Sequence, residues 1–157
     1  MKIFLDIDGV MVHANPSKKL EFDKDGFYKF NNSAITALQT IFDNNINNEV
    51  ILSTSHRFRF SIPKWKRIFT DRGITINKIS RIETPVDHKT SRKVEIINWI
   101  NKHSLDSNDV IIIDDDKSLN GLPTALKHRL LLTNPFIGLN NSIVEENKLY
   151  RDLVHHD

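Results

Sequence analysis

Three short apolar runs, each followed directly by polar residues, dominate the hydrophobic pattern of this chain. They occupy residues 3–5, 50–52 and 110–113. Continuous apolar runs of this length, bounded by turn-forming residues, are typical of strands buried on both faces of a parallel sheet. The pattern therefore predicts three central strands with polar side chains gathered at their carboxyl ends.

Apolar residues at helical spacing separate these runs, which predicts an α/β fold. A first helix is expected from Asn32 or Ser33 to residue 44. A second is expected to begin at Pro63 and to end at Gly73, and a third to begin near Ser91. Later helical segments are expected at 118–128, with a break at 120–121, and from residue 142. Two further strands are expected, one within 74–82 and one at 129–132.

Alternating apolar and polar residues flank the turn sequence Asp-Lys-Asp-Gly at 23–26. This pattern predicts a β-hairpin over residues 18–30. Its aromatic residues stand among lysines, an arrangement on which a single-stranded nucleic-acid end could stack. The alternative is that about half of these rings pack the hairpin onto the core. The rings are Phe22, Phe27, Tyr28 and Phe30.

Length and composition place the chain among ordinary globular proteins. Its 157 residues suit one domain spanning 1–157, with 39% hydrophobic and 27% charged residues. The absence of cysteine excludes disulfides, thiolate zinc sites and a cysteine nucleophile. There is no apolar run of membrane-spanning length and no signal-peptide pattern, so we expect no membrane partner and a cytoplasmic location. The histidine pair at 155–156 is too short to indicate a metal-binding tract.

The first strand ends in two carboxylates, Asp6 and Asp8, followed by Gly9. Because side chains alternate along a strand, the two acids share a face, and the glycine allows a sharp turn beyond them. Neighbouring carboxylates repel each other, and Mg²⁺, which prefers oxygen ligands, relieves that repulsion. The pattern indicates a metal-assisted site with one carboxylate free to act as a nucleophile.

The sequence IFLDIDGV at residues 3–10 resembles the first motif of the haloacid dehalogenase (HAD) superfamily. The resemblance implies that Asp6 attacks phosphorus and forms an aspartyl-phosphate. It also implies that Asp8 protonates the leaving group and later activates water. The second strand, ending in Ser53-Thr54-Ser55, resembles the second motif, whose hydroxyl and following backbone N–H hold phosphoryl oxygens. Counting from the last apolar residues favours Thr54 over Ser53, with Ser55 as a further substrate contact.

Two more segments extend the resemblance to nearly the whole chain. The third motif is a Lys or Arg near the start of the helix before the acidic strand, and Arg92 matches it best, followed by Lys93 and Lys89. The fourth motif is an apolar strand ending in two acids. Asp115 matches its usual metal ligand and Asp114 the acid before it, whereas Asp116 is expected to cap the next helix.

The sequence leaves the role of Arg57, a basic residue after the second strand, open between two possibilities. Arg57 could hold a phosphate bidentately or be a solvated surface charge, and His56 is expected to be a spectator.

As a whole, the resemblance implies a Rossmann-like three-layer sandwich with a central parallel sheet of about five strands. It implies a flap hairpin after the first strand and no cap domain, as in small HAD domains associated with RNA-repair proteins. The function it implies is that of a Mg²⁺-dependent phosphohydrolase, with Asp6, Asp8, Asp114 and Asp115 at the metal. Candidate substrates are nucleotides or nucleic-acid ends, and the chain is expected to be a monomer or weak homodimer. The alternative is a non-catalytic phosphate-binding domain on the same fold.

Overall fold

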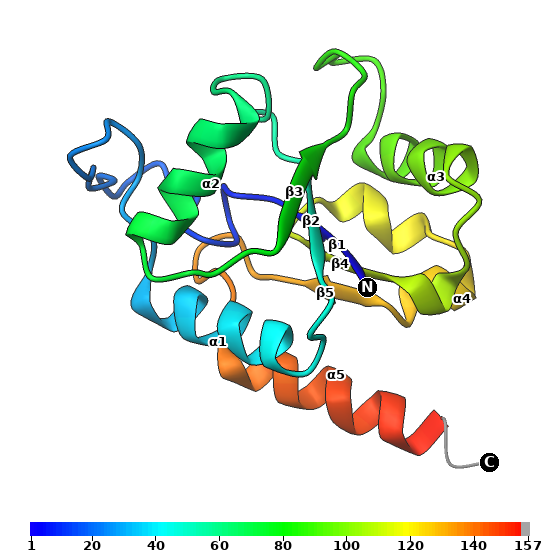
Figure 1. Cartoon of the computed structure of the whole chain (residues 1–157). Helices are drawn as coiled ribbons and strands as arrows, with labels where there is room; N and C mark the ends of the chain where they lie inside the picture. The colour runs from blue at the N-terminus through cyan, green and yellow to red at the C-terminus, as the bar shows by residue number, and fades with distance from the viewer. Residues whose placement is uncertain (155–157) are drawn as a thin grey trace.

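Five parallel strands form one sheet in the order β3-β2-β1-β4-β5 (Figure 1). The structure is a computed structural model that describes residues 1–154, with side chains described up to residue 147. The histidine pair at 155–156 therefore lies outside the described residues. The strands are β1 (Lys2–Leu5), β2 (Glu49–Leu52), β3 (Lys78–Arg81), β4 (Val110–Asp114) and β5 (Leu130–Leu132). The predicted α/β fold with a five-stranded parallel sheet is confirmed.

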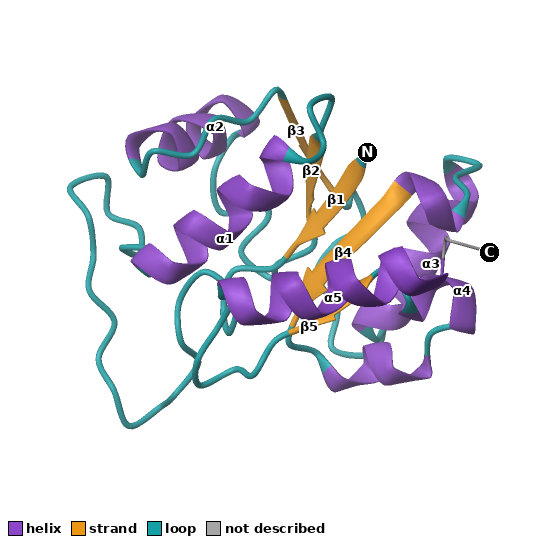
Figure 2. Ribbon diagram, turned by 90° about the horizontal axis from the view of Figure 1, so that it is seen from below, coloured by secondary structure: helices purple, strands orange, loops and turns teal. Residues whose placement is uncertain are grey.

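Helices cover both faces of the sheet and give three layers. They are α1 (Asn32–Asp43), α2 (Ile62–Asp71), α3 (Arg92–Lys102), α4 (Thr124–Lys127) and α5 (Asn141–Val154). In Figure 1, α1, α2 and α5 lie on one side of the strands, and α3 and α4 lie on the other. Figure 2 shows α5 crossing in front of the strands in the view from below. Ser61 and Ser91 cap α2 and α3 through side-chain oxygens that accept backbone N–H groups.

The alternation of side chains along the strands builds two separate cores. Ile3 and Leu5 of β1 pack with the apolar faces of α1, α2 and α5, whereas Phe4 between them packs with α3. Both faces of the central strands are therefore buried, which explains why their sequences are continuous apolar runs rather than alternating ones.

Two of the predicted elements are shorter or divided, within the ranges expected for them, and a third, the hairpin, differs from its prediction. Only residues 78–81 of the stretch 74–82 form a strand. The helix expected at 118–128 is split into a 3₁₀ segment, Lys117–Gly121, and α4, consistent with the break expected at 120–121. The predicted hairpin is a turn closed by a single antiparallel bridge between Phe22 and Tyr28, without two regular strands.

We call residues 13–30 the flap, the blue loop at the left of Figure 1. It is fastened to the body of the protein, because Phe27 and Phe30 are buried in the core and Asp25 is paired with Arg72 at the end of α2. No other insertion among the described residues is long enough for a separate cap, since only residues 82–91 connect β3 to α3. Within the described part of the chain, no helix has the length and apolar character needed to cross a membrane.

Candidate active site

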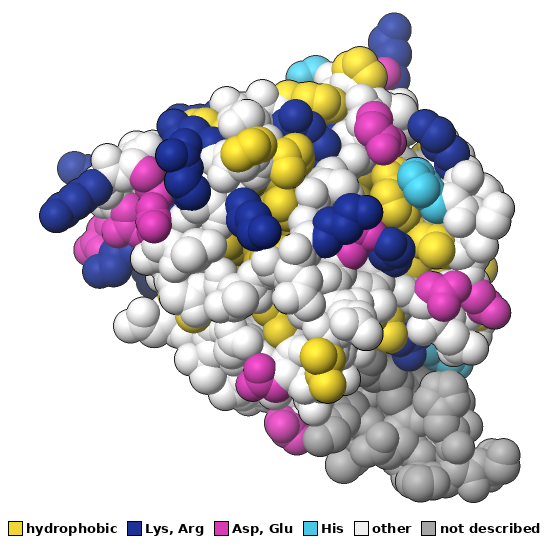
Figure 3. All heavy atoms as spheres, viewed as in Figure 1, with side chains coloured by type: hydrophobic (Ala, Val, Ile, Leu, Met, Phe, Trp, Pro, Cys, Tyr) yellow, Lys and Arg dark blue, Asp and Glu magenta, His cyan; other side chains and the backbone are white. Residues whose placement is uncertain are grey.

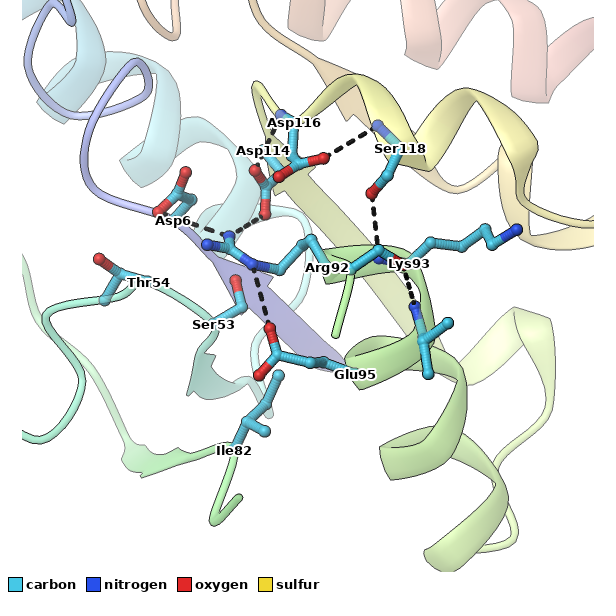
Figure 4. Close-up of polar contacts among 12 residues, drawn as sticks. Asp6, Ser53, Thr54, Ile82, Arg92, Lys93, Glu95, Asp114, Asp116 and Ser118 are labelled. Carbon is cyan, nitrogen blue, oxygen red and sulfur yellow. Dashed lines mark hydrogen bonds and ion pairs between the residues drawn. The ribbon is translucent and has the colours of Figure 1, made fainter. Parts of the chain in front are cut away.

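The three central strands end in one row of polar residues. Leu5 pairs with Leu52 on one side and with Ile113 on the other, so these residues are level across the sheet. The next residue along each strand is Asp6, Ser53 and Asp114, respectively. Residues at the same level of neighbouring parallel strands point to the same face, and Figure 4 shows these three side chains converging on one place. This place is the carboxyl edge of the sheet, where ligands bind in open α/β folds.

Three carboxylates gather here, two from this row and one from the residue that follows Asp114. Asp6, Asp114 and Asp115 each offer an oxygen within 4.8 Å of the others. Gly9 makes room for the third acid, because a Cβ at this position would collide with the carboxylate of Asp115. Oxygen ligands in this number and at this closeness suit a hard divalent cation such as Mg²⁺.

The protonation of the buried acids reflects their crowding. Burial raises the pKa of Asp6 to about 6, against the opposing attraction of Arg92. Burial, with repulsion from Asp6, raises the pKa of Asp114 to about 8. Burial also raises the pKa of Asp115. The cluster therefore carries more negative charge than its surroundings stabilise, and a bound cation would favour the ionised forms of these acids.

Arg92, the first residue of α3, reaches into the cluster. Its Nη1 donates to Asp114 Oδ2 at 2.6 Å and lies 3.6 Å from Asp6 Oδ1. The pKa of Arg92 is raised because the attraction of Asp114 and Asp6 outweighs the cost of burial. Arg92 is thus the cation of the site, as the third-motif resemblance implied.

The other two cationic candidates are not in the site. The Lys93 side chain points away from the carboxylates in Figure 4 and lies beside Gly121. In this position it does not reach the place where the predicted substrate contact would be made. Lys89 is exposed in the loop before α3, where its backbone N–H donates to Asp87. Of these three candidates, Arg92 is the one whose side chain points toward the ends of β1 and β4.

Arg57 is neither the phosphate ligand nor the surface charge that the sequence suggested. Its guanidinium is buried and donates to the carbonyl oxygens of Ile82 and Thr84 in the β3–α3 loop. Its Nη2 also donates to Glu95 at 2.5 Å, and Glu95 lies 3.7 Å from Arg92. With every direction of its planar head group used, Arg57 braces the loops around the cavity that it lines together with Arg92.

The two hydroxyl candidates of the second motif differ in their surroundings. Ser53 lies in the row with Asp6, and its Oγ is buried without a hydrogen-bond partner in the described structure. Thr54 is one residue further, and its Oγ1 accepts the backbone N–H of His56 at 3.2 Å. The register therefore places Ser53 nearer the reacting row than the expected Thr54. The signal was present in the sequence, because three apolar residues precede Asp6 and the same number precede Ser53.

Asp8 lies apart from the acidic cluster. Its side chain is 40% exposed, and Oδ2 lies 2.8 Å from Nε2 of His56, the residue expected to be a spectator. Ser55 is exposed and lines, with Arg92 and His88, a cavity of about 290 Å³ that opens beside the row. Asp116 accepts the backbone N–H of Ser118 at 2.9 Å and so caps the following 3₁₀ segment, as expected.

Comparison with known proteins gives one family. The family described as "HAD domain in Swiss Army Knife RNA repair proteins" matches residues 2–144. No curated protein matches the sequence.

Solved structures with a similar arrangement include the cobalt-bound deoxy-D-mannose-octulosonate 8-phosphate phosphatase of Haemophilus influenzae. It is 16% identical, with a TM-score of 0.44, and the match covers 96% of this chain and 86% of that chain. A protein of Pseudomonas syringae pv. phaseolica assigned to the YrbI phosphatase family is 15% identical, with a TM-score of 0.45 and coverage of 96% and 84%. A protein of Legionella pneumophila assigned to the subfamily III A hydrolases of the HAD superfamily is 13% identical, with a TM-score of 0.46 and coverage of 96% and 83%.

Proposed function

This chain belongs to the family of HAD domains found in Swiss Army Knife RNA repair proteins, and from that premise we propose that it is a Mg²⁺-dependent phosphohydrolase. The observation that carries the proposal is the row at the carboxyl edge of the sheet. Asp6, a buried carboxylate on a central strand, faces the guanidinium of Arg92 at 3.6 Å and stands beside two further acids. In this proposal, three segments of the chain supply the nucleophile, the cation for the phosphoryl group and the metal ligands, namely the ends of β1 and β4 and the start of α3.

In the proposed reaction, an Asp6 carboxylate oxygen forms a bond to phosphorus while the bond from phosphorus to the leaving oxygen breaks. Asp8, two residues further along, gives its proton to the leaving oxygen. A water molecule then attacks the phosphorus of the aspartyl-phosphate, Asp8 takes the proton from this water, and inorganic phosphate is released with Asp6 regenerated. Arg92 and the Ser53 hydroxyl hold the phosphoryl oxygens during both steps.

The residues that would hold Mg²⁺ are Asp6, Asp114, Asp115 and the backbone carbonyl of Asp8. When bound, the ion supplies positive charge that stabilises the phosphoryl oxygens as charge develops on them. The raised pKa values of Asp6 and Asp114 support this assignment, because both acids must be ionised to act as ligands and a cation beside them favours that state.

We further propose that the substrate is a phosphorylated nucleic-acid end or nucleotide. The family description, which refers to RNA repair, supports this substrate class. The absence of a cap among the described residues leaves the site open to a large substrate. Figure 3 shows Lys and Arg side chains over the upper half of one face, with hydrophobic atoms and some acidic side chains among them. Cations beside hydrophobic atoms are compatible with a polyanion that also presents bases.

The test is release of inorganic phosphate by the purified protein, with Mg²⁺ or with excess EDTA. The substrates are p-nitrophenyl phosphate, nucleoside monophosphates and phosphorylated oligonucleotides. Asp6→Asn keeps the shape of the side chain but removes the attacking charge, so turnover should fall by at least about a hundredfold, or ~2.7 kcal/mol in the barrier.

Folding of Asp6→Asn should survive, since one of the crowded charges is removed. The matched control is Asp116→Asn, whose side chain caps the 3₁₀ segment instead of joining the cluster. Full activity in EDTA, or an Asp6→Asn variant with more than a tenth of wild-type turnover, would contradict the mechanism. Phosphate binding without turnover would favour the non-catalytic alternative.

A further inference from the structure

The carboxylate of Asp8 is held by a single histidine. Asp8 Oδ2 lies 2.8 Å from Nε2 of His56, a residue 48 positions away in the sequence. In the tautomer of His56 that carries a proton on Nε2, this nitrogen donates to Asp8 Oδ2, which leaves the other carboxyl oxygen of Asp8 available for proton transfer. In the described structure, Asp8 is not part of the acidic cluster. Its contact with His56 therefore sets the direction in which its carboxylate points.

His56 is itself fixed from two sides. Its backbone N–H donates to Oγ1 of Thr54, which ties it to the β2–α2 loop. Its ring packs edge-on against Phe27 and Tyr28 of the flap, with centroid distances of 5.7 and 5.6 Å. Phe27 is fully buried in the core, so the imidazole rests on a rigid support. A ring held in this way can impose one orientation on a partner that is partly exposed to solvent.

We propose that His56 is a positioning residue that aims the Asp8 carboxyl group at the leaving oxygen of the substrate. This inference rests on the proposed function, because it requires Asp8 to transfer protons. Its consequence is specific to the leaving group. An alkoxide is a poor leaving group and needs the proton from Asp8, whereas p-nitrophenolate leaves without one.

The experiment compares p-nitrophenyl phosphate with benzyl phosphate, which has a ring of similar size but an alkoxide leaving group. The quantity measured is kcat/KM, which reports only the steps up to departure of the leaving group. His56→Ala should lower kcat/KM for benzyl phosphate at least about tenfold more than for p-nitrophenyl phosphate. A loss of general packing would lower both values by the same factor.

Three further variants separate positioning from stability. In His56→Gln, the amide nitrogen can occupy the place of Nε2, so this variant should recover most of the activity on benzyl phosphate. His103→Ala is the matched control, since His103 packs on Trp99 at the far end of α3 from the site. In an Asp8→Asn background, His56→Ala should add little further loss, because a residue that acts through Asp8 has nothing left to position.

Each outcome decides the proposal. A selective loss on benzyl phosphate, rescued by His56→Gln, supports it. Equal losses on both substrates, or additive losses in the double variant, overturn it while leaving the phosphohydrolase assignment intact. If the wild-type protein turns over neither substrate, nor any other tested above, with Mg²⁺, the proposed function fails and the role of His56 fails with it.

Discussion

At the scale of single residues, the site depends on one glycine that has no chemistry of its own. Gly9 adopts a φ of +77°, a conformation that side-chain-bearing residues rarely take, and its missing Cβ leaves the space that Asp115 occupies. The DxDG pattern therefore combines two requirements. The backbone must turn immediately after Asp8, and an acid from β4 must approach that turn closely.

We predict that Gly9→Ala impairs the metal site beyond its effect on folding. The backbone strain alone should cost roughly 1–2 kcal/mol of stability. Gly73→Ala is the control, because Gly73 has a similar φ of +81° but no atom within 4 Å of an added Cβ. Both variants should lose comparable stability in urea unfolding, whereas only Gly9→Ala should weaken Mg²⁺ binding, by about tenfold or more in calorimetry. Equal metal affinity in the two variants would show that Asp115 is not a ligand.

At the scale of elements, one buried arginine joins the flap to the end of α2. Arg72, at the end of α2, donates to both carboxylate oxygens of Asp25 at 2.7 and 3.0 Å and to the carbonyl of Tyr28 at 2.9 Å. Its guanidinium also lies 4.9 Å from the ring centroid of Phe30. The flap is therefore a fixed wall of the site, and its connection to α2 keeps Phe27 against His56.

We predict that Arg72→Met loosens the flap without unfolding the protein. Removing the hydrogen-bond donor of this partly buried ion pair should cost about 1–3 kcal/mol, which chemical denaturation would measure. Proteolysis should then cut first within residues 13–30. A flap that remains as resistant to protease as in the wild type would show that Phe27 and Phe30 hold it alone.

The Asp25 side of this pair carries a pH dependence. The hydrogen bonds from Arg72 lower the pKa of Asp25 below its ordinary value of 3.8. A lowered pKa in the folded state gives stability that is present above the unfolded value and is lost as the pH falls through the folded one. The stability difference between wild type and Asp25→Asn should therefore be constant near neutral pH and shrink below pH 3.8. A difference that grows on acidification would contradict this pairing.

At the scale of the whole molecule, the uncovered carboxyl edge of the sheet leaves room for a large substrate. The structure removes Phe27 and Phe30 from the list of possible stacking residues, because both are buried. Of the predicted rings it leaves Phe22, 59% exposed, and the half-buried Tyr28. It adds Phe58 in the β2–α2 loop, which is 47% exposed and was not among the predicted rings. Arg59 stands next to Phe58 in that exposed loop. Exposed rings among cations are the elements with which proteins bind single-stranded nucleic acid.

We predict that a phosphorylated oligonucleotide is a better substrate than the matching mononucleotide. Its kcat/KM should be at least about tenfold higher at low salt, or ~1.4 kcal/mol. The advantage should shrink as salt increases, because contacts to the backbone phosphates release counterions. Phe58→Ala should reduce the advantage, and thermal unfolding of this variant would check that its fold is as stable as that of the wild type. Equal efficiency on both substrates would remove the nucleic-acid substrate while leaving the phosphatase chemistry.

The sequence by itself determined the strands, most helices and the carboxylates of the site. The runs at residues 3–5, 50–52 and 110–113 predict buried strands because burial on both faces demands apolar residues at every position. Asp6, Asp114 and Asp115 follow such runs directly, so a local pattern locates them. The position of Arg92 could be predicted because it lies at the start of a helix whose apolar face is recognisable in the sequence. These features depend on neighbours within a few residues, and the hydrophobic pattern of the sequence reports such local structure.

Only the tertiary structure decided the roles that depend on register and distant partners. Ser53 stands level with Asp6 because β1 and β2 pair in one particular alignment. The equal apolar runs before the two residues are compatible with this alignment, but the pairing of the two strands decides it. Arg57 is a buried brace because Glu95, 38 residues away, meets it from another element. His56 contacts Asp8, 48 residues away, because β1 and β2 lie side by side in the sheet. A side chain's partner is set by packing between elements, and the free energy of that packing comes from residues far apart in the chain.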